Sequence, residues 1–239
     1  MELNNAVAVV TGANRGLGSH LAARLVERGA KVYGAARRPE TVDVPGVIPL
    51  RLDVTDEASI REAARVASDA TLLINNAGIS TGATLIGGDV AEVRREMETN
   101  FFGPLAATRA FAPVIEGNGG GAVLNVLSAL SWFHPAGLGS YAASKAAAWA
   151  LSDATREELA PRGIAVSALH VGYMDTDMAA GVPADQKVAA ADVAAQALHG
   201  IETGLPEILA DETSRHVKQS LSAASQPNTL SAAPQPHTD

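Results

Sequence analysis

The sequence predicts an α/β fold in which a parallel β-sheet of about seven strands carries helices on both faces. Three observations lead to this prediction. Short apolar runs alternate with helix-like segments, the first run ends directly in a glycine-rich turn, and small side chains dominate the apolar content. Of the 239 residues, 47% are hydrophobic and only 4% aromatic, which suits helices packed closely on a sheet.

The first elements show the alternation. Residues 7–10 (VAVV) form a continuous apolar run, which is typical of a strand buried on both faces. A helix is predicted over residues 17–28, because Leu17, Leu21 and Leu25 share one helical face. The remaining strands are expected at residues 31–35, 47–52, 71–74, 122–127, 164–169 and 207–210. The remaining helices are expected at residues 57–68, 89–115, 140–160 and 191–202.

Caps, prolines and composition refine this arrangement. Asp56 is placed to cap the second helix, and Pro104 and Pro113 are expected to kink the third. Near the C-terminus the composition shifts to Ser, Ala, Pro, Gln and Thr, which leaves little to bury. The sequence therefore predicts a single domain over residues 1–219 and a disordered tail over 220–239.

Charge and cysteine content exclude several classes of function. The net charge is −8, so an extended basic face for nucleic acid is not expected. The chain has no cysteine, which excludes disulfides, thiolate nucleophiles and cysteine-ligated zinc. Residues 1–10 have no basic leader, and no apolar run reaches the ~18 residues of a membrane span. We expect a cytoplasmic protein that binds neither nucleic acid nor membrane, and no cluster of His, Asp and Glu suggests a metal site.

A glycine-rich turn joins the first strand to the first helix. Its spacing is Gly-x-x-x-Gly-x-Gly, within the sequence TGANRGLG at residues 11–18. Glycines let the backbone approach a pyrophosphate, and the N–H groups at a helix start attract phosphate. A tight loop without a ligand is the plain alternative. We predict dinucleotide binding by Gly12, Asn14, Arg15, Gly16, Leu17 and Gly18.

The end of the second strand favours NADP(H) over NAD. An acidic residue there would bond both ribose hydroxyls, but Arg37 and Arg38 follow the strand and the first carboxylate is Glu40. Arginine binds phosphate bidentately, so Arg37 is predicted to hold the 2′-phosphate, with Arg15 reaching it from the other side. Solvated surface arginines are the alternative. Asp53, followed by Val54, is a plausible acceptor for the adenine amino group.

Tyr141 and Lys145 are the candidate reacting pair. They lie at i and i+4 on a predicted helix, so their side chains share one face. A free phenol has a pKa near ~10, and a neighbouring ammonium lowers it, as does an oxidised nicotinamide. Tyr141 is therefore predicted to protonate an alkoxide in reduction or to take a hydroxyl proton in oxidation. Ser128 follows a predicted strand and can orient the substrate oxygen toward the phenol.

These motifs together resemble the single-domain branch of the short-chain dehydrogenase/reductase family. The resemblance covers about residues 5–210 and is carried by Thr11-Gly-x-x-x-Gly-x-Gly18, Asn75-Asn76-Ala77-Gly78, Asn100, Ser128 and Tyr141-x-x-x-Lys145. It implies a Rossmann-type sheet, a nicotinamide cofactor, and a Ser-Tyr-Lys site assisted by Asn100. The matching asparagine in the family supports a water that links the lysine to solvent. The turn Asn75-Asn76-Ala77-Gly78 is expected to pack against the adenine side of the cofactor, with Asn75, Ala77 and Gly78 as its binding residues, or to act as a plain turn that supports the sheet.

One loop departs from the family pattern. The family usually has Pro-Gly and then a Thr four residues after the Gly. Here Gly172 and Thr176 keep their places, but Val171 replaces the proline. The resemblance implies that Thr176 reaches the nicotinamide carboxamide. Without the fixed φ of proline, this loop is expected to be more mobile.

The sequence thus predicts an NADPH-dependent carbonyl reductase, or an alcohol dehydrogenase in reverse, with Asn100, Ser128, Tyr141 and Lys145 as catalytic residues. Its substrate would be a ketone, an aldehyde or a secondary alcohol. A non-catalytic NADP-binding regulatory or interaction protein is the alternative, since a fold alone does not settle function. A sugar-nucleotide epimerase or dehydratase would need a larger C-terminal domain.

The walls of the substrate pocket and the oligomer interface complete the expectations. Residues 173–188 form a short candidate lid, with Met174, Met178 and Val182 as apolar contacts. The opposite wall is assigned to Trp132, Phe133 and His134, with ordinary packing as the alternative. Exposed small-residue faces are expected on two helices, where family members pair into homodimers or homotetramers. They comprise Ala106, Ala107 and Ala110, and Ala142, Ala146, Ala150 and Ala154.

Overall fold

The computed structural model describes residues 1–221, and its seven strands form one parallel sheet. The strand order is β3-β2-β1-β4-β5-β6-β7. The strands are β1 (Val7–Thr11), β2 (Lys31–Ala36), β3 (Ile48–Arg51), β4 (Leu72–Asn75), β5 (Gly121–Val126), β6 (Ile164–His170) and β7 (Glu207–Leu209). The doubly wound α/β sheet is therefore confirmed. The tail expected over 220–239 lies, beyond its first two residues, outside the described residues.

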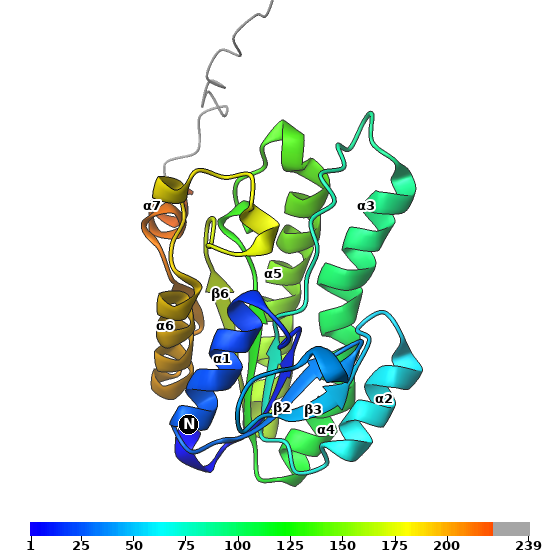
Figure 1. Cartoon of the computed structure of the whole chain (residues 1–239), viewed down its shortest axis with the longest axis vertical. Coiled ribbons are helices and arrows are strands. Elements are labelled where there is room, and N and C mark those ends of the chain that lie inside the picture. The colour runs from blue at the N-terminus through cyan, green and yellow to red at the C-terminus, as the bar shows by residue number, and fades with distance from the viewer. Residues whose placement is uncertain (222–239) are drawn as a thin grey trace, which may run out of the picture.

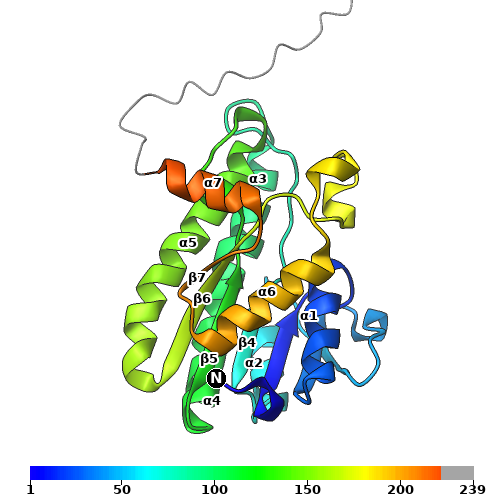
Figure 2. The same ribbon diagram turned by 90° about the vertical axis from the view of Figure 1, so that its left-hand side faces the viewer.

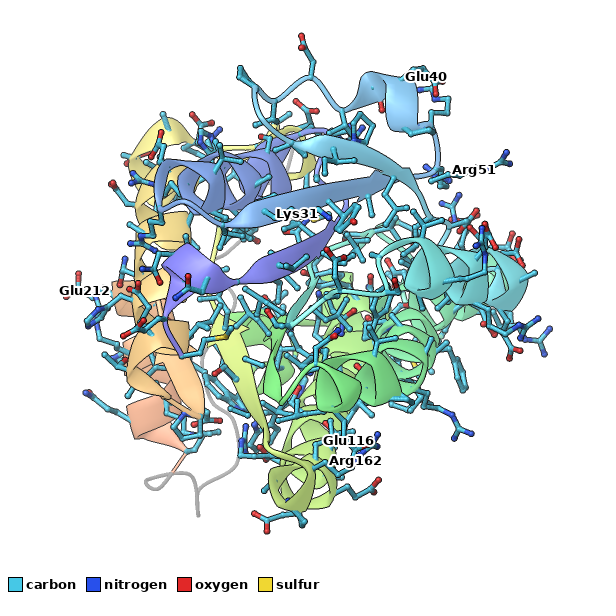
Figure 3. The ribbon with its side chains drawn as sticks, turned by 90° about the horizontal axis from the view of Figure 1, so that it is seen from below. Lys31, Glu40, Arg51, Glu116, Arg162 and Glu212 are labelled. Carbon is cyan, nitrogen blue, oxygen red and sulfur yellow. The ribbon has the colours of Figure 1, made fainter. Side chains whose placement is uncertain are left out.

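Helices cover both faces of the sheet, as Figure 3 shows from below. On one face lie α1 (Gly16–Glu27) and α6 (Ala190–Thr203), which contact each other along their lengths. On the other face lie α2 (Glu57–Val66), α4 (Gly103–Gly117) and α5 (Gly139–Leu159). Two shorter helices are α3 (Val90–Met97), which leads into α4, and α7 (Glu212–Ser220), which crosses near the top of α5 in Figure 2.

The central strand β4 shows why the strands are apolar throughout. Leu72 and Ile74 pack into the core on the α1 side, and Leu73 packs into the core on the α4 side. All three side chains are fully buried. In the sheet, β1 lies between β2 and β4. The chain runs outward from β1 to β2 and β3 and then resumes on the other side of β1 with β4, so the strand order reverses between β1 and β4. In open α/β sheets a crevice for ligands forms at this point, beyond the carboxyl ends of the strands.

Polar side chains hold the ends of two helices in place. Arg162, in the turn before β6, donates from Nη2 to Oε2 of Glu116 near the end of α4, at 2.7 Å. Figure 3 shows these two side chains together at the amino end of the sheet. The helix cap predicted at Asp56 is confirmed, since its carboxylate accepts from the N–H of Ala58 at 2.9 Å.

The long helical stretch predicted over 89–115 is confirmed, but it is not one regular α-helix. The structure divides it into α3, a π-helical turn (Glu98–Phe102) and α4. Pro104 lies in the first turn of α4, directly after the π-helical turn. Pro113 lies inside α4. The sequence analysis also missed α7, because its polar sequence has no apolar period; a capping box between Asp211 and Ser214 starts it instead.

The prediction of an exposed position is wrong for two of the alanines. Ala107 and Ala142 have no exposed surface and belong to the interior. Ala106, Ala110 and Ala146 are partly buried, and Ala150 and Ala154 are exposed. The exposed small-residue strip is therefore narrower than the sequence pattern indicated.

Candidate active site

The turn between β1 and α1 brings three glycines close to a second turn. Gly12 and Gly16 have positive φ angles of 68° and 55°, a conformation that favours glycine. A Cβ added at Gly18 would lie 2.2 Å from the carbonyl oxygen of Gly12 and 2.6 Å from the Asn76 amide nitrogen. Among the described residues, no side chain caps the start of α1 at Arg15. The free N–H groups of this helix start fit a pyrophosphate.

Thr11 and Asn76 hold these two turns together. The Thr11 hydroxyl accepts from the N–H groups of Asn76 and Ala77 at 2.9 and 3.0 Å. The Asn76 side chain donates to the carbonyl oxygen of Thr11 at 2.8 Å. The sequence placed Asn76 in the turn expected to pack against the cofactor, but not among the individual cofactor-binding residues. Its position between two glycine turns was the available signal.

Two of the predicted cofactor residues direct their side chains into the core. Leu17 is 4% exposed and packs with α1 against the sheet. Asn75 is buried, and its amide donates to Asn125 at 2.8 Å and to Thr108 at 3.2 Å. Only the backbone of these two residues is available to a ligand, and the Asn75 side chain joins β4, β5 and α4.

Other predicted residues lie at the crevice. Arg37 is exposed directly after β2, and Asn14 is exposed within the glycine turn. Asp53 follows β3, where its carboxylate accepts from the N–H and the hydroxyl of Thr55. Val54 packs against the start of α4. The ends of β1, β2 and β3 thus gather these side chains on the same edge of the sheet.

Tyr141 and Lys145 lie one turn apart near the start of α5, beside the end of β5. The Lys145 ammonium is 5.7 Å from the centre of the Tyr141 ring and donates to the carbonyl oxygen of Val126 at 2.8 Å. Ser128 follows β5 after Leu127, and its hydroxyl accepts from the N–H of Leu130 at 3.1 Å. The structure therefore brings together Ser128, Tyr141 and Lys145, which the sequence motifs grouped in one site.

The pKa of Tyr141 is not lowered as the sequence analysis expected. Burial raises the pKa of Tyr141 to about 12, and the negative charge of Glu96 adds to this effect, while a hydrogen bond from Ser128 opposes it. Burial also lowers the pKa of Lys145 to about 8. The expectation from the sequence considered only the Lys145 ammonium. Desolvation by burial is the largest cause of the pKa shifts of both Tyr141 and Lys145. In the chain without cofactor, the phenol is protonated at neutral pH.

Asn100 lies in the π-helical turn, a conformation found often at functional sites. Its side chain accepts from the N–H of Ile79 and donates to the Ile79 carbonyl oxygen, both at 2.9 Å. It also donates to the Ser144 hydroxyl, which in turn donates to the Tyr141 carbonyl oxygen at 2.7 Å. The Asn100 side chain thus ties the segment after β4 to the start of α5.

Glu96 is a buried carboxylate that the sequence analysis missed. It lies one turn before Asn100 and is 0% exposed. Its Oε1 accepts from the N–H and the hydroxyl of Thr81. Asn100 and Glu96 therefore bind the backbone of alternate residues, Ile79 and Thr81, and fix one wall of the crevice.

His170 was also missed, and it lies directly behind Ser128. It is 0% exposed, its ring stacks on Trp132 with centroids 3.7 Å apart, and Nδ1 lies 3.2 Å from the Ser128 carbonyl oxygen. A carbonyl only accepts, so Nδ1 carries the proton. Nε2 has no hydrogen-bond partner among the described residues and faces Glu207 at 3.8 Å. Burial lowers the pKa of His170 to about 4.

The wall assigned to Trp132, Phe133 and His134 is only partly built as expected. Trp132 is buried on His170 and belongs to the packing behind the site, whereas His134 is exposed. Three further histidines, His20, His199 and His216, are exposed on helix surfaces.

Hydrogen bonds hold the loop after β6 where it begins, at Gly172, and where its two ends pair with each other. The N–H of Gly172 donates to Asp211 at 2.8 Å, and Tyr173 and Asp175 exchange backbone hydrogen bonds with Val188. Thr176 lies against the glycine turn, 3.3 Å from a Cβ built on Gly16. The cap residue of α7 therefore holds Gly172, next to Val171, which stands where the family usually has proline.

Comparison with known proteins identifies the family. The model of the family described as short chain dehydrogenase matches residues 6–187. The chain belongs to the short-chain dehydrogenase/reductase family. It is accordingly an oxidoreductase of the class that acts on CH–OH and C=O groups with a nicotinamide cofactor.

Individual family members resemble the chain over most of its length. A short-chain dehydrogenase from Burkholderia cenocepacia J2315, solved in complex with NADP, is 39% identical with a TM-score of 0.90 and covers 94% of this chain and 95% of its own. A 3-oxoacyl-[acyl-carrier-protein] reductase of Salmonella typhimurium is 33% identical over 87% of this chain and 88% of its own. An NADPH-dependent 1-acyldihydroxyacetone phosphate reductase of Schizosaccharomyces pombe is 35% identical over 74% of this chain, which spans only 62% of that protein.

Two features of residues 1–221 bear on membranes and on metal ions. Within this range no helix combines the length and the apolar character that crossing a bilayer requires. The same residues contain no group of three or more His, Asp or Glu side chains that could hold a metal ion.

The buried histidine predicts a pH-dependent stability. In the unfolded chain a histidine binds its proton near pH 6.5, but folded His170 resists protonation until about pH 4. The unfolded state therefore binds more protons in this window, and stability falls as pH falls. We expect the wild type to lose about 2–3 kcal/mol more than His170→Phe between these two pH values, measured by urea unfolding.

His20→Asn is the matched control, since this histidine is exposed and its replacement should leave the pH dependence unchanged. Parallel stability curves for the wild type and His170→Phe would show that His170 is not buried in its neutral form.

Proposed function

We propose that the protein reduces a ketone or an aldehyde to an alcohol with NADPH, and that Tyr141 donates the proton. The observation that carries this proposal is the arrangement at the end of β5. A protonated, partly buried phenol lies on the same helix face as a buried ammonium, and the Ser128 hydroxyl hydrogen-bonds to the phenol. A protonated phenol is a general acid, which carbonyl reduction requires and alcohol oxidation does not.

Each residue has a separate task in this reaction. The Ser128 hydroxyl holds the carbonyl oxygen of the substrate and directs it toward the phenol. Tyr141 gives its proton to this oxygen as negative charge develops there. Lys145, held by Val126, places a positive charge beside the phenolate that remains and stabilises it. When bound, the reduced nicotinamide supplies the hydride to the carbonyl carbon. Asn100 acts on these groups by positioning the start of α5 and Ile79.

The preference for NADP(H) rests on charge at the adenine side of the crevice. Arg37 is exposed after β2, and Arg15 lies in the glycine turn. Both side chains are exposed, and arginine binds a 2′-phosphate with its planar fork. The Burkholderia cenocepacia structure contains NADP, and the fission yeast relative is named as NADPH-dependent. A structure from Burkholderia phymatum, 24% identical, contains NAD.

Replacing Tyr141 by Phe should remove the proton donor without disturbing the site. We expect kcat for a carbonyl substrate to fall by a factor of about 10²–10⁴, since general acid catalysis contributes this much. NADPH affinity should stay within about twofold, because the ring and Lys145 remain. Steady-state assays of ketones and aldehydes, with cofactor binding measured by nicotinamide fluorescence, check this. Full turnover by the variant would exclude Tyr141 as the acid.

Replacing Arg37 by Ala should weaken NADPH binding selectively. Loss of a charge-assisted hydrogen bond to phosphate costs about 1.5–3 kcal/mol, so we expect the Kd for NADPH to rise by a factor of about 10–100. NADH lacks the 2′-phosphate and serves as the internal control, with an unchanged Kd. A wild type that binds NADH more tightly than NADPH, or a variant that weakens both equally, would contradict the assignment.

We also propose that the protein forms a homodimer or homotetramer through α4 and α5. The exposed part of the small-residue face, Ala150 and Ala154, allows close approach of two helices. Phe102 at the start of α4 is 46% exposed for so large an apolar side chain. Sedimentation should show an oligomer for the wild type and a monomer for Ala150→Glu at micromolar concentration. A monomeric wild type would overturn this proposal.

A further inference from the structure

An ion pair joins the glycine turn to the candidate substrate loop. Arg15 Nη1 lies 3.1 Å from Asp177 Oδ2, although the two residues are 162 positions apart in sequence. Arg15 precedes the first residue of α1, and Asp177 follows Thr176, the residue that contacts Gly16. Figures 1 and 2 both show the loop, in yellow, next to the amino end of α1. The pair therefore bridges the glycine turn and the loop after β6.

This ion pair is weak and easily exchanged. The Arg15 and Asp177 side chains are 73% and 77% exposed, so water and salt screen their attraction. The contact uses one terminal nitrogen of the guanidinium, which leaves the bidentate fork unused. A 2′-phosphate has more negative charge and three acceptor oxygens, so it competes well for the same cation.

From this arrangement we infer that Asp177 is a specificity-determining residue, which competes with the 2′-phosphate of the cofactor for Arg15 and so limits the preference for NADPH over NADH. The inference rests on the proposed role of Arg15 at the 2′-phosphate. With NADH, Arg15 stays on Asp177 and tethers the loop to the glycine turn. With NADPH, Arg15 turns to the phosphate and the loop loses this tether.

The base of the loop does not depend on this pair. Asp175 pairs with Lys187 at 3.0 Å, within the loop itself, and Val188 binds Tyr173 and Asp175 through the backbone. Exchange of Arg15 would therefore release the segment that begins at Asp177 and leave the loop anchored. Asp175 also provides a matched control, because it has the same charge, lies two residues away and pairs with a different cation.

The test is the affinity of Asp177→Asn for both cofactors, measured by nicotinamide fluorescence on the full chain. Removal of the competing carboxylate should tighten NADPH binding roughly 2- to 5-fold, in line with the strength of an exposed ion pair. NADH binding should stay unchanged. Asp175→Asn should leave the ratio of the two dissociation constants as in the wild type. In Arg15→Ala/Asp177→Asn, the effect of the Asp177 change on NADPH should vanish relative to Arg15→Ala alone.

Three results would overturn the inference: no change in NADPH affinity, weaker NADPH binding, or an equal change for both cofactors. Weaker binding would mean that Asp177 orients Arg15 instead of competing for it. Failure of the proposed function looks different, because the wild type would then bind neither cofactor, or Arg15→Ala would bind NADPH as tightly as the wild type does.

Discussion

A buried ammonium group at the end of β5 sets the geometry on which the site depends. Lys145 is 5% exposed, and its ammonium is fixed by the carbonyl oxygen of Val126. A charge so far from water must be hydrogen-bonded, and this need fixes the rotation of α5 about its axis. Because Tyr141 lies one turn earlier on the same face, the phenol is placed beside Ser128 as a consequence. The contact between Lys145 and Val126 thus sets how α5 and the Tyr141 phenol lie relative to the end of β5.

Support for this contact comes from segments far apart in the chain. Asn100 and Glu96 hold the wall formed by Ile79 and Thr81. On the other side, His170 supports the Ser128 carbonyl, and Asp211 holds the loop at Gly172. The last of these contacts comes from the cap of α7, so the C-terminal part of the described chain contributes to the active site although it supplies no reacting group.

The succession of strands and helices along the chain could be predicted from the sequence, and so could the shared helix face of Tyr141 and Lys145, because both depend on local patterns. Continuous apolar runs reported strands buried on both faces, and the i, i+4 spacing of Tyr141 and Lys145 reported their shared face. The direction of the Tyr141 pKa could not be obtained in this way. Desolvation depends on everything that surrounds the phenol, including Glu96, which approaches it from another helix. The π-helical turn at Asn100 and the polar helix α7 likewise depend on tertiary contacts and caps, which an apolar period does not report.

The proposed reaction depends most directly on the coupling between the Tyr141 phenol and the bound cofactor. A ¹³C NMR titration of tyrosine labelled at Cζ follows each phenol separately, and Tyr141→Phe identifies the relevant signal. The chain has three tyrosines, so the spectrum is simple. We expect the pKa of Tyr141, about 12 in the free chain, to fall when NADP⁺ binds, because the cationic ring favours the phenolate. A pKa that is the same with and without saturating NADP⁺ would contradict the placement of this phenol beside the nicotinamide.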